Sequence, residues 1–391
     1  MEDIVILDGA RTAIGTFGGS LAATPPTALG VHVAQEAMAR AGVSPDQIGH
    51  VAMGHVINTE PRDMYLSRVT AIEAGIPDGT PAMNVNRLCG SGLQAIVSCA
   101  QNLMLGDAAF ALAGGAESMS RGPHIMQSAR FGQKMGDTGA VDMMLNALMC
   151  PFGTGHMGVT AENVAREHGI SREDQDAFAL ESQQRAQRAI AEGAFASQIA
   201  PIEIKVKRQA VMFDTDEHPK QTSLEALAGL RAAFAKEGSV TAGNASGIND
   251  GAAAVGMATA AAAQAAGLKP RARILGYAHA GVRPEVMGIG PVPAVQTLMQ
   301  KLDMKVSEFD VVESNEAFAA QACAVSKELG FSAEQVNPNG GAIALGHPVG
   351  ATGAIIMVKA LYELERRGGG RAICTMCIGG GQGIAVAIEA L

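Results

Sequence analysis

Short apolar runs rich in β-branched residues alternate along this chain with longer stretches rich in alanine and leucine. The apolar runs are residues 4–8 (IVILD), 50–57 (HVAMGHVI), 110–115 (FALAGG), 309–315 (FDVVESN) and 372–379 (AICTMCIG). Residues 28–41 and 350–367 instead have the length and composition of helices. This alternation predicts an α/β fold in which helices cover the faces of parallel sheets.

Two distant segments repeat the same order of features. Residues 84–119 and 337–381 each run from Asn-x-Asn through a loop, a Gly-rich helix start and a long apolar helix to a strand that ends in small residues. Between about residues 118 and 249 methionines and charged helices appear instead, which indicates an inserted region. The repeat predicts two βαβ-type copies, and in such sheets ligands gather beyond the carboxyl ends of the strands.

The composition narrows the class of protein. The chain has 391 residues, 48% of them hydrophobic, so it can bury sizeable cores. Six scattered cysteines do not resemble a disulfide framework and indicate free thiols in a reducing compartment, in this case the cytoplasm. The first residues, MEDIVILDGARTAIG, lack the basic segment of an export signal. A net charge of −9 argues against nonspecific binding of nucleic acid.

The longest uncharged run, residues 251–268, is rich in alanine. It contains Gln264 and two internal glycines, so it is too weakly hydrophobic to span a bilayer. We therefore expect a packed helix here and no association with a membrane.

The stretch CTMCIGGGQG, residues 374–383, contains two cysteines ahead of a run of glycines. A zinc site usually needs a second pair of ligands, and a redox CxxC usually opens a helix; neither context is present, so we expect no metal site. Because residues three apart on a strand point to opposite faces, Cys374 is expected to be buried while Cys377 faces a pocket. A phosphate-binding loop would continue into a helix, whereas QGIAVAIEAL has strand alternation.

Three other residues have positions that suit catalysis. Cys89 directly precedes Gly90-Ser91-Gly92 and an apolar helix, where the helix dipole would lower the pKa of its thiol and favour a nucleophilic thiolate. The alternative is a tight strand-to-helix turn. His347 occupies the equivalent place in the second copy and could act as a base opposite Cys89. Asn315 ends another strand, where it could cap the following helix or polarise a carbonyl group.

Several motifs together identify the chain as similar to the thiolase family. They are RTAIGTFGG, NRLCGSGLQA, GGAESMS, HMGVTAENVA, TAGNASGINDGAAA, MGIGPVPA, NEAFAAQA, NPNGGAIALGHPVGATGA and CIGGGQG, which run from end to end. The HMG sequence at residues 156–158 resembles the bacterial biosynthetic acetyl-CoA acetyltransferases and β-ketothiolases. The resemblance implies duplicated βαβαβ halves layered α-β-α-β-α, with residues 1–118 plus 250–268 in one half, residues 119–249 as an inserted loop domain and residues 269–391 in the other half.

The resemblance also implies a catalytic set. Cys89 would be the nucleophile that becomes acylated and His347 the base that activates it, while Cys377 would move a proton at the α-carbon. Asn315, through a water shared with His347, would form one oxyanion hole. The backbone N–H groups of Cys89 and Gly379 would form the other.

Coenzyme A would bind as a substrate, with no tightly bound cofactor. The residues implied for it are mostly apolar and suit the pantetheine arm: Leu148, His156, Met157, Ala233, Phe234, Ala242, Ser246, Ala317 and Phe318. Where relatives commonly have an arginine near the nucleotide, this chain has Lys220, which binds phosphate as a point charge. A surface lysine without a ligand is the alternative.

The expected activity is that of an acetyl-CoA C-acetyltransferase, which condenses two acetyl-CoA molecules to acetoacetyl-CoA and CoA or cleaves 3-ketoacyl-CoA. The alternatives are a degradative 3-ketoacyl-CoA thiolase of β-oxidation and a noncatalytic carrier of acyl-CoA or lipid on the same fold. A carrier would be expected to lose Cys89, His347 or Cys377, and all three are present. Thiolases of this kind imply a homotetramer that assembles from dimers through a loop of the inserted region.

Overall fold

The structure is a computed structural model that describes residues 2–206 and 209–391. Its centre is a ten-stranded mixed sheet in which β2 (Gly15–Thr16) pairs with β12. The remaining strands follow in the order β14 (Val311–Ser314), β15 (Arg371–Ile378), β16 (Gln382–Ala390), β13 (Ala272–Gly281), β1 (Ile4–Arg11), β12 (Asn249–Thr259), β5 (Phe110–Ser118), β3 (His50–Gly54) and β4 (Ala82–Val85).

The sheet consists of two halves that meet at β1 and β13, where Val5 pairs with Arg273 and Ile6 with Ala272. The predicted parallel pairing is confirmed for β3 with β4 and β5, and for β14 with β15. The pairs that involve β12, β13 and β16 are antiparallel. The prediction of parallel sheets was therefore wrong for the middle of the molecule, where β1, β12, β13 and β16 pair antiparallel with their neighbours.

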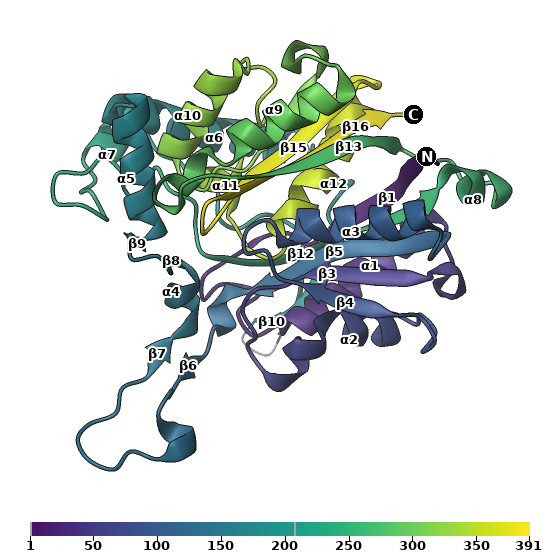
Figure 1. Cartoon of the computed structure of the whole chain (residues 1–391), viewed down its shortest axis with the longest axis horizontal. Helices are drawn as coiled ribbons and strands as arrows, with labels where there is room; N and C mark the ends of the chain where they lie inside the picture. The colour runs from purple at the N-terminus through teal and green to yellow at the C-terminus, as the bar shows by residue number, and fades with distance from the viewer. Residues whose placement is uncertain (1, 207–208) are drawn as a thin grey trace.

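Helices and strands alternate in five layers (Figure 1). On the outer face of the first half lie α1 (Pro26–Ala41) and α2 (Leu66–Glu73), and α1 packs on β1, β5 and β12. Between the halves lie α3 (Ser91–Leu105) and α12 (Thr352–Arg367), which contact each other and strands of both halves. The outer face of the second half is covered by α9 (Pro291–Leu302), with α10 (Ala319–Leu329) against it. The expected α-β-α-β-α layering is confirmed.

The alanine-rich residues 251–268 form a strand and a short helix, so the prediction of one packed helix was wrong. β12 is buried along its whole length between β1 and β5, and α8 (Ala260–Ala265) follows it. Alanine favours helices, but here small side chains let α1 approach the strand: a methyl group at Gly256 would lie 3.1 Å from Cβ of Ala41. Within the described part of the chain no helix is long and apolar enough to cross a membrane.

The residues between β5 and β12 form the inserted region, and two of its helices, α5 (Met157–His168) and α6 (Arg172–Ala191), pack against α10 of the second half. The loop between β6 (His124–Ile125) and β7 (Val141–Asp142) forms an arm that extends away from the body (Figure 1). The other elements are α4 (Met143–Ala147), β8 (Met149–Cys150), β9 (Gly155–His156), β10 (Ile202–Val206), β11 (Gln209–Phe213) and α7 (Leu224–Ala228).

A buried ion pair fastens this region to β1. The guanidinium of Arg11 donates two hydrogen bonds to the carboxylate of Asp216, at 2.7 and 2.9 Å, and both side chains are fully buried. The ring of Phe195 lies 5.0 Å from the guanidinium carbon. Because an unpaired buried charge is strongly destabilising, the pair holds residue 216 in place, and with it the neighbouring His218.

Candidate active site

Glycines bring the starts of α3 and α12 into contact. A methyl group at Gly92 would lie 2.7 Å from the backbone nitrogen of Ala354, and one at Gly353 would overlap the backbone nitrogen of Leu93. Only residues without a side chain permit this approach. The contact places the loops that precede the two helices opposite each other, and these loops carry Cys89 and His347.

The Cys89 loop is a tight, strained turn. Leu88 has φ of 45°, in the left-handed region that side chains rarely adopt. The hydroxyl group of Ser91 donates to the carbonyl oxygen of Leu88 at 2.6 Å and accepts from the backbone N–H of Arg87 at 2.8 Å. These bonds hold Cys89 at the wall of a cavity of about 590 Å³, which His347 and Gly379 also line.

His347 is held in one tautomer. Its Nδ1 lies 2.6 Å from Oγ1 of Thr352, and that hydroxyl group donates its single proton to the carbonyl oxygen of Pro348 at 2.9 Å. The hydroxyl oxygen must therefore accept from His347 Nδ1–H, which leaves Nε2 with a free lone pair. Nε2 is buried, and no group among the described residues pairs with it. The free nitrogen of a neutral imidazole can take up a proton.

Burial sets the charge state of both groups. It lowers the pKa of His347 to about 4, so the imidazole is neutral near pH 7. It also raises the pKa of Cys89 to about 11, although the N–H groups of Gly379 and of Cys89 itself act in the opposite direction. The predicted lowering of the Cys89 pKa by a helix N-terminus was therefore wrong, because loss of water outweighs the nearby donors.

The two cysteines of the CxxC sequence lie on opposite faces of β15, as predicted. The thiol of Cys374 donates to the carbonyl oxygen of Ile356 in α12 at 3.7 Å. Cys377 is buried on the other face in a cluster that includes Met157 and Phe318. Burial and the nearby sulfur of Cys89 raise the pKa of the Cys377 thiol. The two sulfurs of the CxxC sequence thus have different surroundings.

The glycines after Cys377 form a turn and not a phosphate-binding loop, because β16 follows directly. Gly380 and Gly381 have φ of 84° and 89°, and a side chain on Gly381 would overlap the carbonyl oxygen of Val282. This turn directs the N–H of Gly379 at the sulfur of Cys89. The backbone N–H groups of Cys89 and Gly379 therefore both act on this sulfur.

Asn315 follows β14 and has its backbone fixed on both sides. Its N–H donates to Thr375 at 3.0 Å, and its carbonyl oxygen accepts from the Gln321 side chain at 3.2 Å. Both atoms of its side-chain amide are buried without a partner among the described residues. A void of about 10 Å³ borders Asn315, Gly346 and Thr352, which is room for one water. Asn315 does not cap the following helix, which begins at Ala319.

Most residues expected to bind coenzyme A line the cavity with Cys89 and His347: Leu148, His156, Met157, Ala233, Phe234, Ala242, Ser246, Ala317 and Phe318. The rings of His156 and Phe234 stack with centroids 4.6 Å apart. Lys220 is exposed and does not line the cavity; Gln183 and Gln187 bind its backbone. Cys377 and Asn315 are not among the lining residues, but Cys377 packs in one cluster with Met157 and Phe318, which are.

Other residues of the site were not predicted from sequence. His218 lines the cavity and contacts Asn249, whose side-chain oxygen accepts from the N–H of His347 at 3.0 Å. Thr352 orients the imidazole. The only local signal for Thr352 is its place in the GHPVGATG sequence, five residues after His347. Further lining residues that no pattern indicated are Phe17, Val56, Met119, Met287 and Val349.

Comparison with known proteins decides the family. A family model for the thiolase N-terminal domain matches residues 4–261, and one for the thiolase C-terminal domain matches residues 268–390. A beta-ketothiolase (BktB) of Cupriavidus necator is 58% identical over 390 residues, 99% of each chain. The chain belongs to the thiolase family. The predicted family and the prediction of an acyltransferase enzyme are confirmed.

Further relatives cover the whole thiolase chain as well. An acetyl-CoA acetyltransferase of Cupriavidus necator is 48% identical over 392 residues, 100% of both chains. The crystal structure of human mitochondrial 3-ketoacyl-CoA thiolase in complex with CoA has a TM-score of 0.97 and 43% sequence identity, and the match covers 100% of this chain and 98% of that one. The expected thiolase fold is confirmed.

Proposed function

We propose that this thiolase is an acetyl-CoA C-acetyltransferase that catalyses reversible Claisen condensation of acyl-CoA through an acyl-cysteine intermediate. One observation carries the proposal. Cys89 and His347 line the same cavity, with the free Nε2 of a neutral histidine opposite a thiol and two N–H groups directed at its sulfur. A thiol, a base and a pair of oxyanion donors are what acyl transfer to sulfur requires.

The acyl transfer follows from the charge states. His347 Nε2 takes the proton of Cys89 as the sulfur attacks the 3-keto carbon of a 3-ketoacyl-CoA. The new oxyanion accepts hydrogen bonds from the N–H groups of Cys89 and Gly379. The C2–C3 bond then breaks, which leaves the acyl group on Cys89 and an acetyl-CoA enolate. Because both groups start neutral, proton transfer accompanies the attack, and no stable thiolate is needed beforehand.

Cys377 completes the cleavage as the acid. Its raised pKa keeps the thiol protonated, so it can give its proton to C2 of the enolate and release acetyl-CoA. In the second half-reaction CoA-SH gives its proton to Cys377 and attacks the acyl group as a thiolate. The sulfur of Cys89 then leaves the acyl group and recovers its proton from His347. In the reverse direction Cys377 removes the α-proton of acetyl-CoA. Asn315, through a water shared with His347, binds the enolate oxygen.

The apolar side of the cavity suits the pantetheine arm of coenzyme A. His156, Phe234 and Phe318 form a connected aromatic wall, with Phe234 and Phe318 edge to face at 6.1 Å. Leu148, Met157, Ala233, Ala242, Ser246 and Ala317 extend this surface. We assign Lys220, outside the cavity, to the nucleotide end, where an exposed lysine binds phosphate as a point charge. In this proposal coenzyme A is a substrate and not a resident cofactor.

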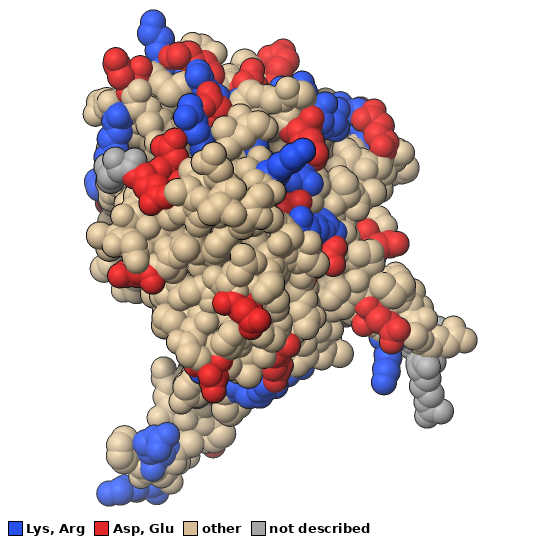
Figure 2. Space-filling model, turned by 90° about the vertical axis from the view of Figure 1, so that its right-hand side faces the viewer, with Lys and Arg blue, Asp and Glu red and all other residues tan. Residues whose placement is uncertain are grey.

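We also propose a cytoplasmic homotetramer built as a dimer of dimers. The arm between β6 and β7 exposes Met126, Phe131 and Met135, large apolar side chains that a partner would cover. Positive side chains gather toward the end of this arm (Figure 2), where Arg130 and Lys134 are exposed. These features support the arm as the contact between dimers.

Two alternatives predict different behaviour. A degradative 3-ketoacyl-CoA thiolase would cleave longer substrates best, and a noncatalytic carrier would bind acyl-CoA without turnover. The fixed tautomer of His347 disfavours a carrier, since binding alone does not need an oriented base.

Steady-state assays of the purified protein test the proposed function. We expect release of CoA from acetyl-CoA alone, and thiolysis of 3-ketoacyl-CoA substrates with ping-pong kinetics, because an acyl-enzyme separates the two half-reactions. The assays use 3-ketoacyl chains from C4 to C8. Binding of acetyl-CoA without turnover would support a carrier, and a strong preference for C8 over C4 would support the degradative thiolase.

Replacing Thr352 with valine is expected to lower kcat roughly tenfold or more, part of the 10²–10⁴-fold that a general base contributes. Valine keeps the shape but removes the acceptor of His347 Nδ1–H, so the tautomer with a protonated Nε2 becomes populated. KM for acetyl-CoA should change little, because Thr352 is not part of the cavity lining. Thr352→Ser retains the hydroxyl group and should restore kcat; equal kcat in all three proteins would contradict the role.

A further inference from the structure

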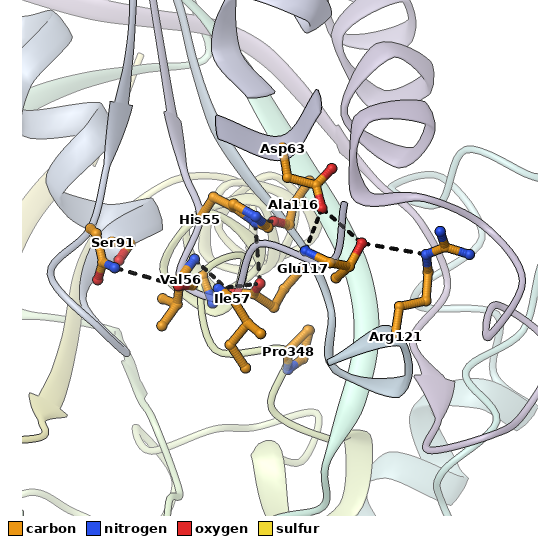
Figure 3. Close-up of polar contacts among 12 residues, drawn as sticks. His55, Val56, Ile57, Asp63, Ser91, Ala116, Glu117, Arg121 and Pro348 are labelled. Atoms are coloured by element: carbon orange, nitrogen blue, oxygen red, sulfur yellow. Dashed lines mark hydrogen bonds and ion pairs between the residues drawn. The ribbon is translucent and has the colours of Figure 1, made fainter. Parts of the chain in front are cut away.

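A buried carboxylate lies beneath the candidate active site. Glu117 is near the carboxyl end of β5 and His55 directly follows β3, the strand paired with β5. Both side chains are almost completely inaccessible, with 0% and 2% of their surfaces exposed. Figure 3 shows this cluster, in which His55 and Glu117 are directed toward each other beside Val56 and Ile57. Neither residue has a part in the proposed acyl transfer.

Glu117 joins two segments of the chain that are far apart in sequence. Its Oε2 accepts the N–H of Val56 at 3.0 Å and the N–H of Gly350 at 2.9 Å. Its Oε1 accepts the N–H of Ile57 at 3.1 Å. Gly350 lies three residues after His347, so the carboxylate ties the His347 loop to the segment that follows β3. Three N–H donors, from Val56, Ile57 and Gly350, therefore fix the position of this buried carboxylate.

These hydrogen bonds fix walls of the cavity. Val56, whose N–H binds Glu117, lines the cavity, and so does Val349, the neighbour of Gly350. Gly350 has no space for a side chain, since a methyl group there would lie 2.5 Å from Oε2 of Glu117 and 2.9 Å from Cα of His55. Movement of the carboxylate would therefore displace the His347 loop and two lining residues together.

His55 lies directly against this carboxylate. Its Nδ1 lies 3.2 Å from Oε1 of Glu117 and 2.9 Å from the carbonyl oxygen of Ala116. Although burial lowers the pKa of His55, Glu117 raises it, and the net effect is an increase. Asp63, in the short helix Pro61–Tyr65, also raises the pKa of His55. The negative charge of Glu117 disfavours a thiolate at Cys89. The charge of Glu117 therefore acts on both His55 and Cys89.

We propose that Glu117 and His55 act as a charged positioning pair: Glu117 fastens the His347 loop, and His55 offsets the negative charge that would otherwise oppose ionisation of Cys89. The inference rests on the proposed role of Cys89 as nucleophile. Neither residue touches the substrate. Removal of His55 alone leaves the carboxylate without its histidine partner, whereas removal of Glu117 takes away the charge and the fastening together. The two single variants should therefore affect Cys89 in different directions.

The test measures the alkylation of Cys89 by iodoacetamide between pH 7 and pH 9, with the modified peptide quantified by mass spectrometry. The rate follows the thiolate fraction, so one unit of pKa is about a tenfold change. We expect His55→Gln to slow alkylation about tenfold. Glu117→Gln should react at least as fast as the unaltered protein, and the double variant should resemble Glu117→Gln. Glu363→Gln, a buried carboxylate remote from the cavity and bound to Arg366 and Arg367, is the matched control.

Measurement of kcat distinguishes the fastening role of Glu117 from the effect of its charge. Glu117→Gln should lower kcat at least tenfold, because the His347 loop loses its anchor, although its alkylation rate is not reduced. Equal slowing of alkylation in both single variants, or none with His55→Gln, would overturn the proposal. If His55→Gln fails to fold while the double variant folds, the unpaired charge of Glu117 causes the failure, and the proposal is supported. If all three variants fail to fold, the pair serves folding, and the proposal is overturned. Alkylation needs no CoA substrate, so an inactive protein with the expected alkylation rates would refute the proposed function alone.

Discussion

Replacing Cys89 with alanine is expected to abolish the acyl-enzyme and to lower turnover by about 10⁴-fold or more, because no other group can carry the acyl intermediate. Burial raises the pKa of the neighbouring thiol of Cys377, so this thiol stays protonated, and in the proposed reaction it acts as the acid at the α-carbon. It therefore cannot replace the missing nucleophile. The measurement is the mass of the intact protein after incubation with isotopically labelled acetyl-CoA, together with kcat for condensation.

Cys99→Ala is the matched control for this experiment. Cys99 is buried in α3, the same helix that Cys89 precedes, and its thiol donates to the carbonyl oxygen of Leu112 at 3.5 Å, away from the cavity. This variant should acquire the acetyl label as the unaltered protein does. Labelling of Cys89→Ala to the same extent would show that the acyl group is held elsewhere and would refute the proposed mechanism.

Features that depend on neighbouring residues were predicted well from sequence. The glycines that follow Cys89 and Cys377 indicate turns, and alternation in residues 382–390 predicts the strand β16. Residues 28–41 and 350–367 correspond within two residues to α1 and α12. The repeat of residues 84–119 and 337–381 also predicts the opposition of α3 and α12, because equivalent units place equivalent loops at the same edge of the sheet.

Predictions that required knowledge of packing failed. The alanine-rich run became β12, since its neighbours on both sides are strands and small side chains let α1 approach. The pKa of Cys89 is raised and not lowered, because burial is a property of the assembled cavity. In both cases local composition indicated one outcome and tertiary structure produced the other.

Contacts between segments that are far apart in the chain could not be predicted from the sequence. Glu117 and Gly350 are separated by 233 positions, yet one hydrogen bond joins them. The GGAESMS sequence contributed to the family resemblance, but nothing in it shows that its glutamate is buried against the His347 loop. For Lys220 the sequence suggested a contact that the structure does not show. Its place in the sequence suggested binding of phosphate, but the residue does not line the cavity. The assignment stays a prediction.

Replacing Cys377 with alanine is expected to leave acylation of Cys89 intact while condensation and thiolysis fall by about 10²–10⁴-fold. Acyl transfer from acetyl-CoA to Cys89 needs His347 and the N–H donors, whereas only carbon–carbon bond formation or cleavage needs a proton moved at the α-carbon. The variant should therefore take up the label from acetyl-CoA and then stop. Measurement of the intact mass and of thiolysis in the same preparation separates the two half-reactions.

Cys374→Ala is the matched control, because Cys374 is on the same strand but faces α12 and not the cluster around Cys377. We expect it to retain both labelling and thiolysis. If Cys377→Ala retained thiolysis as well, another acid would have to protonate the enolate. Apart from His347, whose proton returns to Cys89 in the proposed reaction, the described lining residues include His156 and His218. Burial lowers the pKa of both, so each is largely neutral near pH 7 and a poor acid. Cys377 is therefore the group whose protonation state suits the task.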